Sequence, residues 1–285
     1  MKLEFVVGLS WPGNPAKPND DAFCHADSLA AVFDGATSLG EPLLPVDSDA
    51  AWIARKGAEG LIAHQDLPPR DALARAAADA ERDYIALRMR APRENYELPL
   101  SSMMMVGLSN DALEFYWFGD CTALVKVPGQ VFTVVGDALA KKGGEAALAS
   151  RLATKHNLAP AASANLPQFL DALRKGRNTV NTAPERWAFS PDARCAAYAS
   201  SKTLVVAAGA TILLCTDGFL ALASDYGRYD AGALLNAALV GGLHPLFEEI
   251  RAIENSDADG RRFPRFKTSD DATALIVRVV DGPSP

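Results

Sequence analysis

The aspartates of this sequence are spaced in a way that could support catalysis. They stand at the edges or ends of five segments that are expected to be extended. The five short motifs that contain them are Asn19-Asp20-Asp21, Asp34-Gly35, Gly119-Asp120, Asp217-Gly218 and Asp270-Asp271. A single Asp-Gly pair is commonly turn chemistry alone. Five such placements in separate segments raise the question of what carboxylates gathered at one point would bind.

Several carboxylates in one place cannot all stay ionised without a cation. Hard divalent ions such as Mg²⁺ or Mn²⁺ meet this need, because they take carboxylate, carbonyl and water oxygens. The four histidines are isolated, without i, i+4 pairs, and the four cysteines lack the paired spacing of a zinc or redox motif. The pattern therefore predicts a centre built from oxygen ligands, in which Asp34 serves a metal.

A cysteine nucleophile is the alternative for phosphoryl chemistry, and Cys121 follows the Gly119-Asp120 pair. No CxxxxxR loop begins at this cysteine, and no basic neighbour stands beside it to lower its pKa. We therefore expect Cys121 to be structural.

Runs of alternating or continuous apolar residues predict groups of strands that alternate with helices along the chain. The expected strands are Leu3–Leu9, Ala22–His25, Leu29–Phe33, Met103–Leu108, Leu113–Phe118, Leu124–Val127, Val131–Val135, Cys195–Ala199, Leu204–Ala207, Ile212–Thr216 and Ala272–Val280. Asn110-Asp111 is expected to form a hairpin turn. The expected helices are Asp47–Gln65, Arg70–Arg90, Ala138–Asn157, Pro167–Lys175 and Tyr229–Asn255.

Composition limits the class of protein. The chain has 285 residues, of which 49% are hydrophobic, enough for the core of one large domain. The net charge is −7 and the basic residues are scattered, which argues against a nucleic-acid or anionic-membrane surface. The longest apolar run, Leu204–Cys215, contains Gly209 and is too short to span a bilayer. Together with single, widely spaced cysteines, these features predict a cytoplasmic protein.

The motifs NDDA, VFDG, FGDC, LLCTDGF and SDDATALIV, in this order, resemble those of the metal-dependent protein phosphatase (PPM) family, the type 2C Ser/Thr phosphatases. The resemblance extends over roughly residues 3 to 280. It implies an α+β fold, a four-layer sandwich of two central antiparallel β-sheets flanked by α-helices. It also implies a single phosphatase domain, residues 1–285, with a helical and basic flap-like insertion around 138–194.

The resemblance also implies roles for individual residues. The implied metal ligands are Asp20, Asp21, Asp34, the Gly35 carbonyl, Asp120, Asp217 and Asp270. Asp34 would bridge two Mn²⁺ or Mg²⁺ ions and, with Asp217, form the catalytic centre. Asp120 matches a position that helps to bind a third metal in bacterial members. Asp271 stands where the family has Asn, and Thr273 where it has Thr.

Three departures from the family pattern concern the reaction. Ala16 replaces a phosphate-binding Arg, Ala36 replaces a His that acts as general acid in many relatives, and Ala221 replaces a late Asp. Phosphate binding, protonation of the leaving group and the third metal are therefore expected to be weakened. Lys17, Arg177 and Arg186 are candidate replacements for the phosphate-binding Arg, although a solvated helix end explains the last two equally well.

The function implied is hydrolysis of phosphoserine and phosphothreonine in a phosphorylated protein, by water activated at a binuclear Mn²⁺ or Mg²⁺ centre. Two alternatives remain open at this point. One is a non-catalytic module that binds a phosphorylated partner, favoured by Ala16 and Ala221 but disfavoured by the full set of aspartates. The other is a hydrolase of small phosphoesters.

Overall fold

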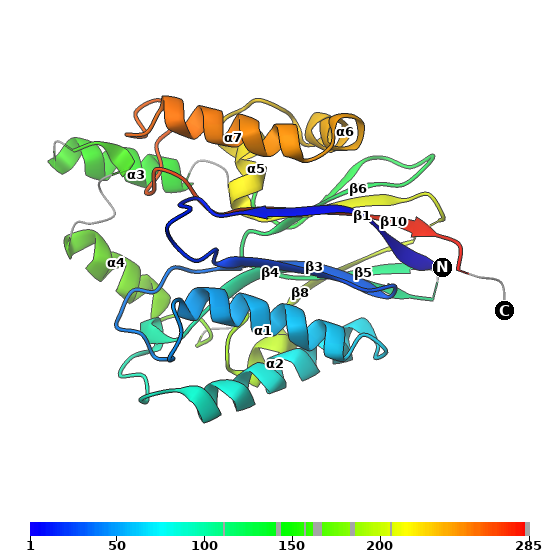
Figure 1. The fold of residues 1–285 in the computed structure, drawn as a ribbon, viewed down its shortest axis with the longest axis horizontal. Coiled ribbons are helices and arrows are strands. Elements are labelled where there is room, and N and C mark those ends of the chain that lie inside the picture. The colour runs from blue at the N-terminus through cyan, green and yellow to red at the C-terminus, as the bar shows by residue number, and fades with distance from the viewer. Residues whose placement is uncertain are drawn as a thin grey trace.

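The computed structural model in Figure 1 describes most of the chain, namely residues 1–110, 112–140, 144–156, 158–161, 167–182, 186–205 and 207–282. The strands in these ranges form two five-stranded sheets. The first sheet has the order β1 (Lys2–Trp11), β10 (Ala272–Val280), β9 (Thr211–Cys215), β6 (Thr122–Lys126) and β7 (Thr133–Val135). The second has the order β2 (Asp21–His25), β3 (Leu29–Gly35), β4 (Ser101–Ser109), β5 (Ala112–Phe118) and β8 (Ser200–Val205).

Every pairing between these strands is antiparallel, and the two sheets lie face to face (Figure 1). Helices α1 (Asp49–Ala63) and α2 (Pro69–Leu87) cover the outer face of the second sheet. Helices α5 (Asp217–Ser224), α6 (Ala231–Gly241) and α7 (His244–Ser256) cover the first. The predicted α+β four-layer sandwich is confirmed.

Strand β3 shows why its sequence is apolar without alternation. Ala30 and Val32 face the core between the two sheets, whereas Ala31 and Phe33 face the core under α1 and α2. All four side chains are fully buried. A strand that is covered on both faces reads as a continuous apolar run, and its first half-buried residue is Asp34 at the end. The layering therefore places that carboxylate where the core stops.

Helices α3 (Gly144–His156) and α4 (Pro167–Arg177) lie at one end of the sandwich, and the N-terminus and the end of β10 lie at the other (Figure 1). The flap-like insertion predicted around 138–194 includes both helices, but residues 141–143, 157, 162–166 and 183–185 lie outside the described part of the chain. Asp111 of the predicted hairpin turn also lies outside it, while Asn110 has a left-handed φ of 52°. Among the described residues, no helix has the length and apolar character needed to cross a membrane.

Several element predictions were wrong. The expected strand Cys195–Ala199 is a 3-10 helix, Ala193–Tyr198, whose N-cap Asp192 accepts a hydrogen bond from the backbone of Arg194. The single helix expected over Tyr229–Asn255 is two helices, because Gly242 adopts a φ of 78° and ends α6. Helix α5, directly after Thr216, was not anticipated. Its eight residues are almost all buried, so they lack the polar face that marks a surface helix.

Candidate metal centre

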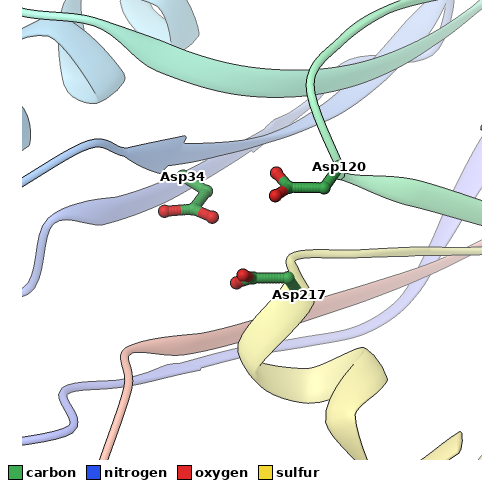
Figure 2. A group of neighbouring side chains, drawn as sticks. All are labelled: Asp34, Asp120 and Asp217. Atoms are coloured by element: carbon green, nitrogen blue, oxygen red, sulfur yellow. The ribbon is translucent and has the colours of Figure 1, made fainter. Parts of the chain in front are cut away.

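Three carboxylates from distant parts of the sequence meet at the end of the sandwich. Asp34, Asp120 and Asp217 each offer one oxygen, and these oxygens all lie within 4.8 Å of one another. Figure 2 shows the three side chains pointing toward a common space. This is the spacing at which several carboxylates can share a divalent cation.

Each carboxylate is placed by the end of a secondary-structure element. Asp34 is near the end of β3, opposite Asp21 in β2 and Ser102 in β4. Asp120 follows the end of β5, and its carboxylate accepts a 2.7 Å hydrogen bond from the Ser102 hydroxyl. Asp217 begins α5 directly after β9. The centre thus takes ligands from both sheets and forms only when the two sheets are packed together.

Two glycines allow the chain to approach itself closely beside these aspartates. A Cβ on Gly35 would lie 2.5 Å from the carbonyl oxygen of Ala50 and 2.6 Å from that of Asp20. A Cβ on Gly218 would lie 2.0 Å from the carbonyl oxygen of Asp271. Neither glycine has a positive φ, so close packing, and not turn geometry, explains the Asp-Gly pairs here.

Asp21 supplies the observation that tests whether a cation fits. Its side chain is 6% exposed, and Oδ2 accepts a 2.9 Å hydrogen bond from the hydroxyl of Thr216. Oδ1 is buried and has no hydrogen-bond partner in the described part of the chain. Burial, and then the nearby Asp270 and Asp271, raise the pKa of Asp21 well above the usual range, although Thr273 and Thr216 oppose this. A buried carboxylate oxygen of this kind, opposite Asp34, is a suitable ligand for a divalent cation.

Asp34 likewise lies among other carboxylates. Its pKa is also raised well above the usual range, first by burial and then by the negative charges of Asp21, Asp120 and Asp270. An all-oxygen donor set of this charge matches Mg²⁺ or Mn²⁺ better than a softer metal. The residues present therefore fit the metals that the sequence predicted.

The remaining predicted ligands are held by other partners. Asp20 accepts a 2.5 Å hydrogen bond from the Ser48 hydroxyl, at the N-cap of α1. Asp270 accepts a 2.7 Å hydrogen bond from Lys267 Nζ and a 3.0 Å bond from the Asp271 backbone. Asp270 interacts electrostatically with Asp34, and Asp20 interacts with Asp270 and Asp271, but neither Asp20 nor Asp270 belongs to the three carboxylates that converge. Their roles as ligands stay predictions.

Asp271, which stands in place of the family's Asn, joins two distant segments. Its carboxylate accepts backbone N–H bonds from Gly13 at 2.7 Å and from Asp20 at 2.6 Å. The loop before β2 is thereby fixed to the start of β10, more than 250 residues away in sequence. An Asn side chain offers one oxygen acceptor, whereas the carboxylate offers two, so Asp suits this double contact.

None of the three predicted phosphate-binding residues forms a described hydrogen bond or ion pair with the three converging carboxylates. Lys17 is exposed and, among the described residues, forms no ion pair and no side-chain hydrogen bond. Arg186 donates a 2.9 Å bond to the Thr179 hydroxyl. Arg177 donates a 2.6 Å bond to the carbonyl oxygen of Thr37, which fixes α4 to the loop that follows Asp34 and Gly35. Burial lowers the pKa of Arg177 to about 10, which leaves the guanidinium charged at neutral pH. Their part in substrate binding stays a prediction.

Three polar residues beside the centre were not predicted from the sequence. Ser48 and Ser102 hydrogen bond to Asp20 and Asp120, and Lys267 pairs with Asp270. Serine is too common to mark such a role by itself. Lys267 lies two residues before the SDDATALIV segment and three before Asp270. This closeness in sequence to a predicted ligand was the one feature that could have marked Lys267 as a site residue.

Comparison with known proteins gives a structural match alone. No protein-family model matches the sequence, and no curated protein matches it. The serine/threonine phosphatase PstP/Ppp of Mycobacterium tuberculosis matches with a TM-score of 0.58 at 12% identity, over 99% of this chain and 100% of that chain. The catalytic domain of PstP in complex with 2 manganese ions matches with a TM-score of 0.54 at 14% identity, over 98% of this chain and 99% of that chain. The PPM Ser-Thr phosphatase MsPP of Mycobacterium smegmatis, in complex with cacodylate, matches with a TM-score of 0.52 at 14% identity, over 96% of this chain and 97% of that chain.

These matches cover nearly the whole of each chain, and all three are with Ser/Thr phosphatases. The chain therefore has the fold of the PPM-type Ser/Thr phosphatases, as the motif order predicted.

Proposed function

We propose that this protein is a metal-dependent phosphatase that hydrolyses phosphoserine and phosphothreonine. The observation that supports this most is the convergence of Asp34, Asp120 and Asp217 within 4.8 Å, in a chain with the PPM phosphatase fold. The fold alone does not define an activity. The added support is that three strand or helix ends deliver carboxylates to one point, beside the buried Asp21 that has an oxygen without a partner.

The residues that would hold Mn²⁺ or Mg²⁺ are Asp34, Asp120 and Asp217, with Asp21 behind them; Asp20, Asp270 and the Gly35 carbonyl remain proposed ligands. When bound, such ions bind phosphoryl oxygens and lower the pKa of a coordinated water. Asp34 and Asp217, which come from opposite sheets, would orient the ions relative to each other. The PstP catalytic domain was solved with 2 manganese ions, which supports two per chain here.

The substrate proposed is a phosphorylated protein, because the structural neighbours are Ser/Thr protein phosphatases. The four cysteines are free and buried, which supports a reducing compartment, the cytoplasm. The direct test is release of phosphate from a phosphothreonine peptide by the purified protein with Mn²⁺. Absence of turnover with Mn²⁺ and with Mg²⁺ would contradict the proposal.

The leaving group should matter more than in relatives that have a general acid. Ala36, directly after Gly35, carries a methyl group that cannot donate a proton. The leaving alkoxide would then take its proton from solvent or from a metal-bound water. Because a general acid contributes about 10²- to 10⁴-fold, we expect the single-turnover rate for p-nitrophenyl phosphate to exceed that for a phosphoserine peptide by about 10²-fold or more. Nitrophenolate leaves without protonation, and a serine alkoxide does not.

The matched variant is Ala36→His. It should raise the rate for the phosphoserine peptide and leave the rate for p-nitrophenyl phosphate nearly unchanged. Equal single-turnover rates for the two substrates in the unmodified protein would show that another residue supplies the proton.

A further inference from the structure

Binding of a phosphate dianion at this centre requires a positively charged side chain as well as metal ions. Ala16 is exposed at the position where relatives place Arg, and Lys17 beside it extends into solvent. The carboxylates around the centre are negative and would repel a phosphomonoester unless cations balance them. Two divalent ions would supply part of this balance, but a hydrogen-bond donor for the outer phosphoryl oxygens would still be needed.

Lys267 brings a positive charge to this place. Its ammonium group lies 2.7 Å from Asp270 Oδ1. Electrostatic attraction to Asp270, Asp34 and Asp217 favours the charged ammonium group. The same ammonium also interacts with Asp20. Lys267 thus lies in the electrostatic field of carboxylates from both sheets.

The segment that bears Lys267 is fixed firmly to the body of the protein. Arg265 donates to the carboxylate of Asp257 at 2.8 Å and to the carbonyl oxygens of Phe263 at 2.9 Å and Thr268 at 3.0 Å. Phe266 stacks on Phe169 of α4 with ring centroids 4.2 Å apart. The backbone on the N-terminal side of Lys267 is therefore held, and this keeps its ammonium group within reach of Asp270.

The side chain keeps the capacity to bind a ligand. It is 49% exposed, and Asp270 accepts one of the three N–H donors of the ammonium group. We propose that Lys267 binds the substrate phosphate and takes the part that Arg has at the position of Ala16 in relatives. The proposal rests on the proposed function, since it assigns a substrate-binding residue to that same centre.

The competing explanation is that Lys267 serves as a counter-ion for Asp270 alone. The two explanations differ in what they predict. A counter-ion affects how tightly metal binds, whereas a phosphate-binding residue affects phosphate affinity at a fixed metal content. The experiment therefore separates metal binding from phosphate binding.

Lys267→Ala and Lys267→Arg are compared with Lys56→Ala. Lys56 is a matched control because its ammonium also pairs with carboxylates, those of Glu59 at 3.0 Å and Asp83 at 3.3 Å, but it lies on α1. Calorimetry first measures Mn²⁺ binding to each protein. Inorganic phosphate is then titrated into each Mn²⁺-loaded protein, and KM and kcat are measured with p-nitrophenyl phosphate.

Lys267→Ala should weaken binding of inorganic phosphate and raise KM by about tenfold, the lower end expected for a charge-assisted hydrogen bond. Its kcat and its Mn²⁺ affinity should stay within about threefold of the unmodified protein. Lys267→Arg should retain phosphate affinity, and Lys56→Ala should change nothing. Unchanged phosphate affinity in Lys267→Ala, or a change confined to Mn²⁺ affinity, would overturn the proposal. Because phosphate binding needs no turnover, an inactive unmodified protein would contradict the phosphatase function but leave this test intact.

Discussion

Asp34→Asn and Asp217→Asn are each expected to lower kcat/KM for p-nitrophenyl phosphate by about 10³-fold or more at saturating Mn²⁺. Each substitution keeps the shape of the side chain and removes one negative charge from a group whose oxygens lie within 4.8 Å of one another. Loss of a single preorganised electrostatic contact in an active site costs about 10²- to 10³-fold, and here the loss would also weaken metal binding. The measurement is steady-state kinetics together with calorimetry of Mn²⁺ binding.

Asp27→Asn is the matched control. Asp27 lies in the turn between β2 and β3, at the opposite end of β3 from Asp34, and its carboxylate is 3.8 Å from Lys2. An exposed ion pair of this kind contributes about 0–1 kcal/mol to stability, so its removal should leave kcat/KM unchanged. Similar losses at Asp27, Asp34 and Asp217 would show that the convergence of carboxylates is unrelated to activity.

Gly218→Ala is expected to lower the free energy of unfolding by about 2–4 kcal/mol, as severe overpacking at a fixed site does. The added Cβ would lie 2.0 Å from the carbonyl oxygen of Asp271, so the start of α5 and the start of β10 would have to separate. That separation would also shift Asp217 and weaken Mn²⁺ binding. Urea denaturation of the metal-free protein measures the first effect, and calorimetry measures the second.

Gly176→Ala provides the comparison. Gly176 is in α4, and a Cβ there would meet nothing within 4 Å. Alanine is a better helix former than glycine by about 0.5–1 kcal/mol, so this variant should be as stable as the unmodified protein or more stable. If Gly218→Ala were equally stable and bound Mn²⁺ normally, close packing would not explain the Asp-Gly pair.

Most strands and the strand-end aspartates were predicted because they depend on local patterns, whereas the layers were implied by the resemblance to the PPM family. The apolar run of β3 stops directly before Asp34, and the same pattern at β9 points to Asp217. The break at Gly242 was missed because an apolar helical pattern continues on both sides of it. The 3-10 helix at Ala193–Tyr198 was missed because its apolar letters also suit a strand.

Contacts between distant segments could not be predicted in the same way. The resemblance placed Asp271 where the family has Asn. Its two hydrogen bonds, from the backbone N–H groups of Gly13 and Asp20, join segments more than 250 residues apart and leave no local pattern. Lys267 likewise becomes notable only when both sheets bring carboxylates toward it. Arg177 was predicted from its charge, yet its hydrogen bond to Thr37 depends on how α4 lies against the loop after β3.

Metal dependence tests the central claim most directly. Phosphate release from p-nitrophenyl phosphate and from a phosphothreonine peptide is measured before chelation, after chelation, and after Mn²⁺ or Mg²⁺ is returned, with calorimetry on the chelated protein. Because every proposed ligand is an oxygen, we expect activity to vanish on chelation, to return with either ion, and to require at least two ions per chain. Full activity in the chelated, metal-free protein would contradict the account.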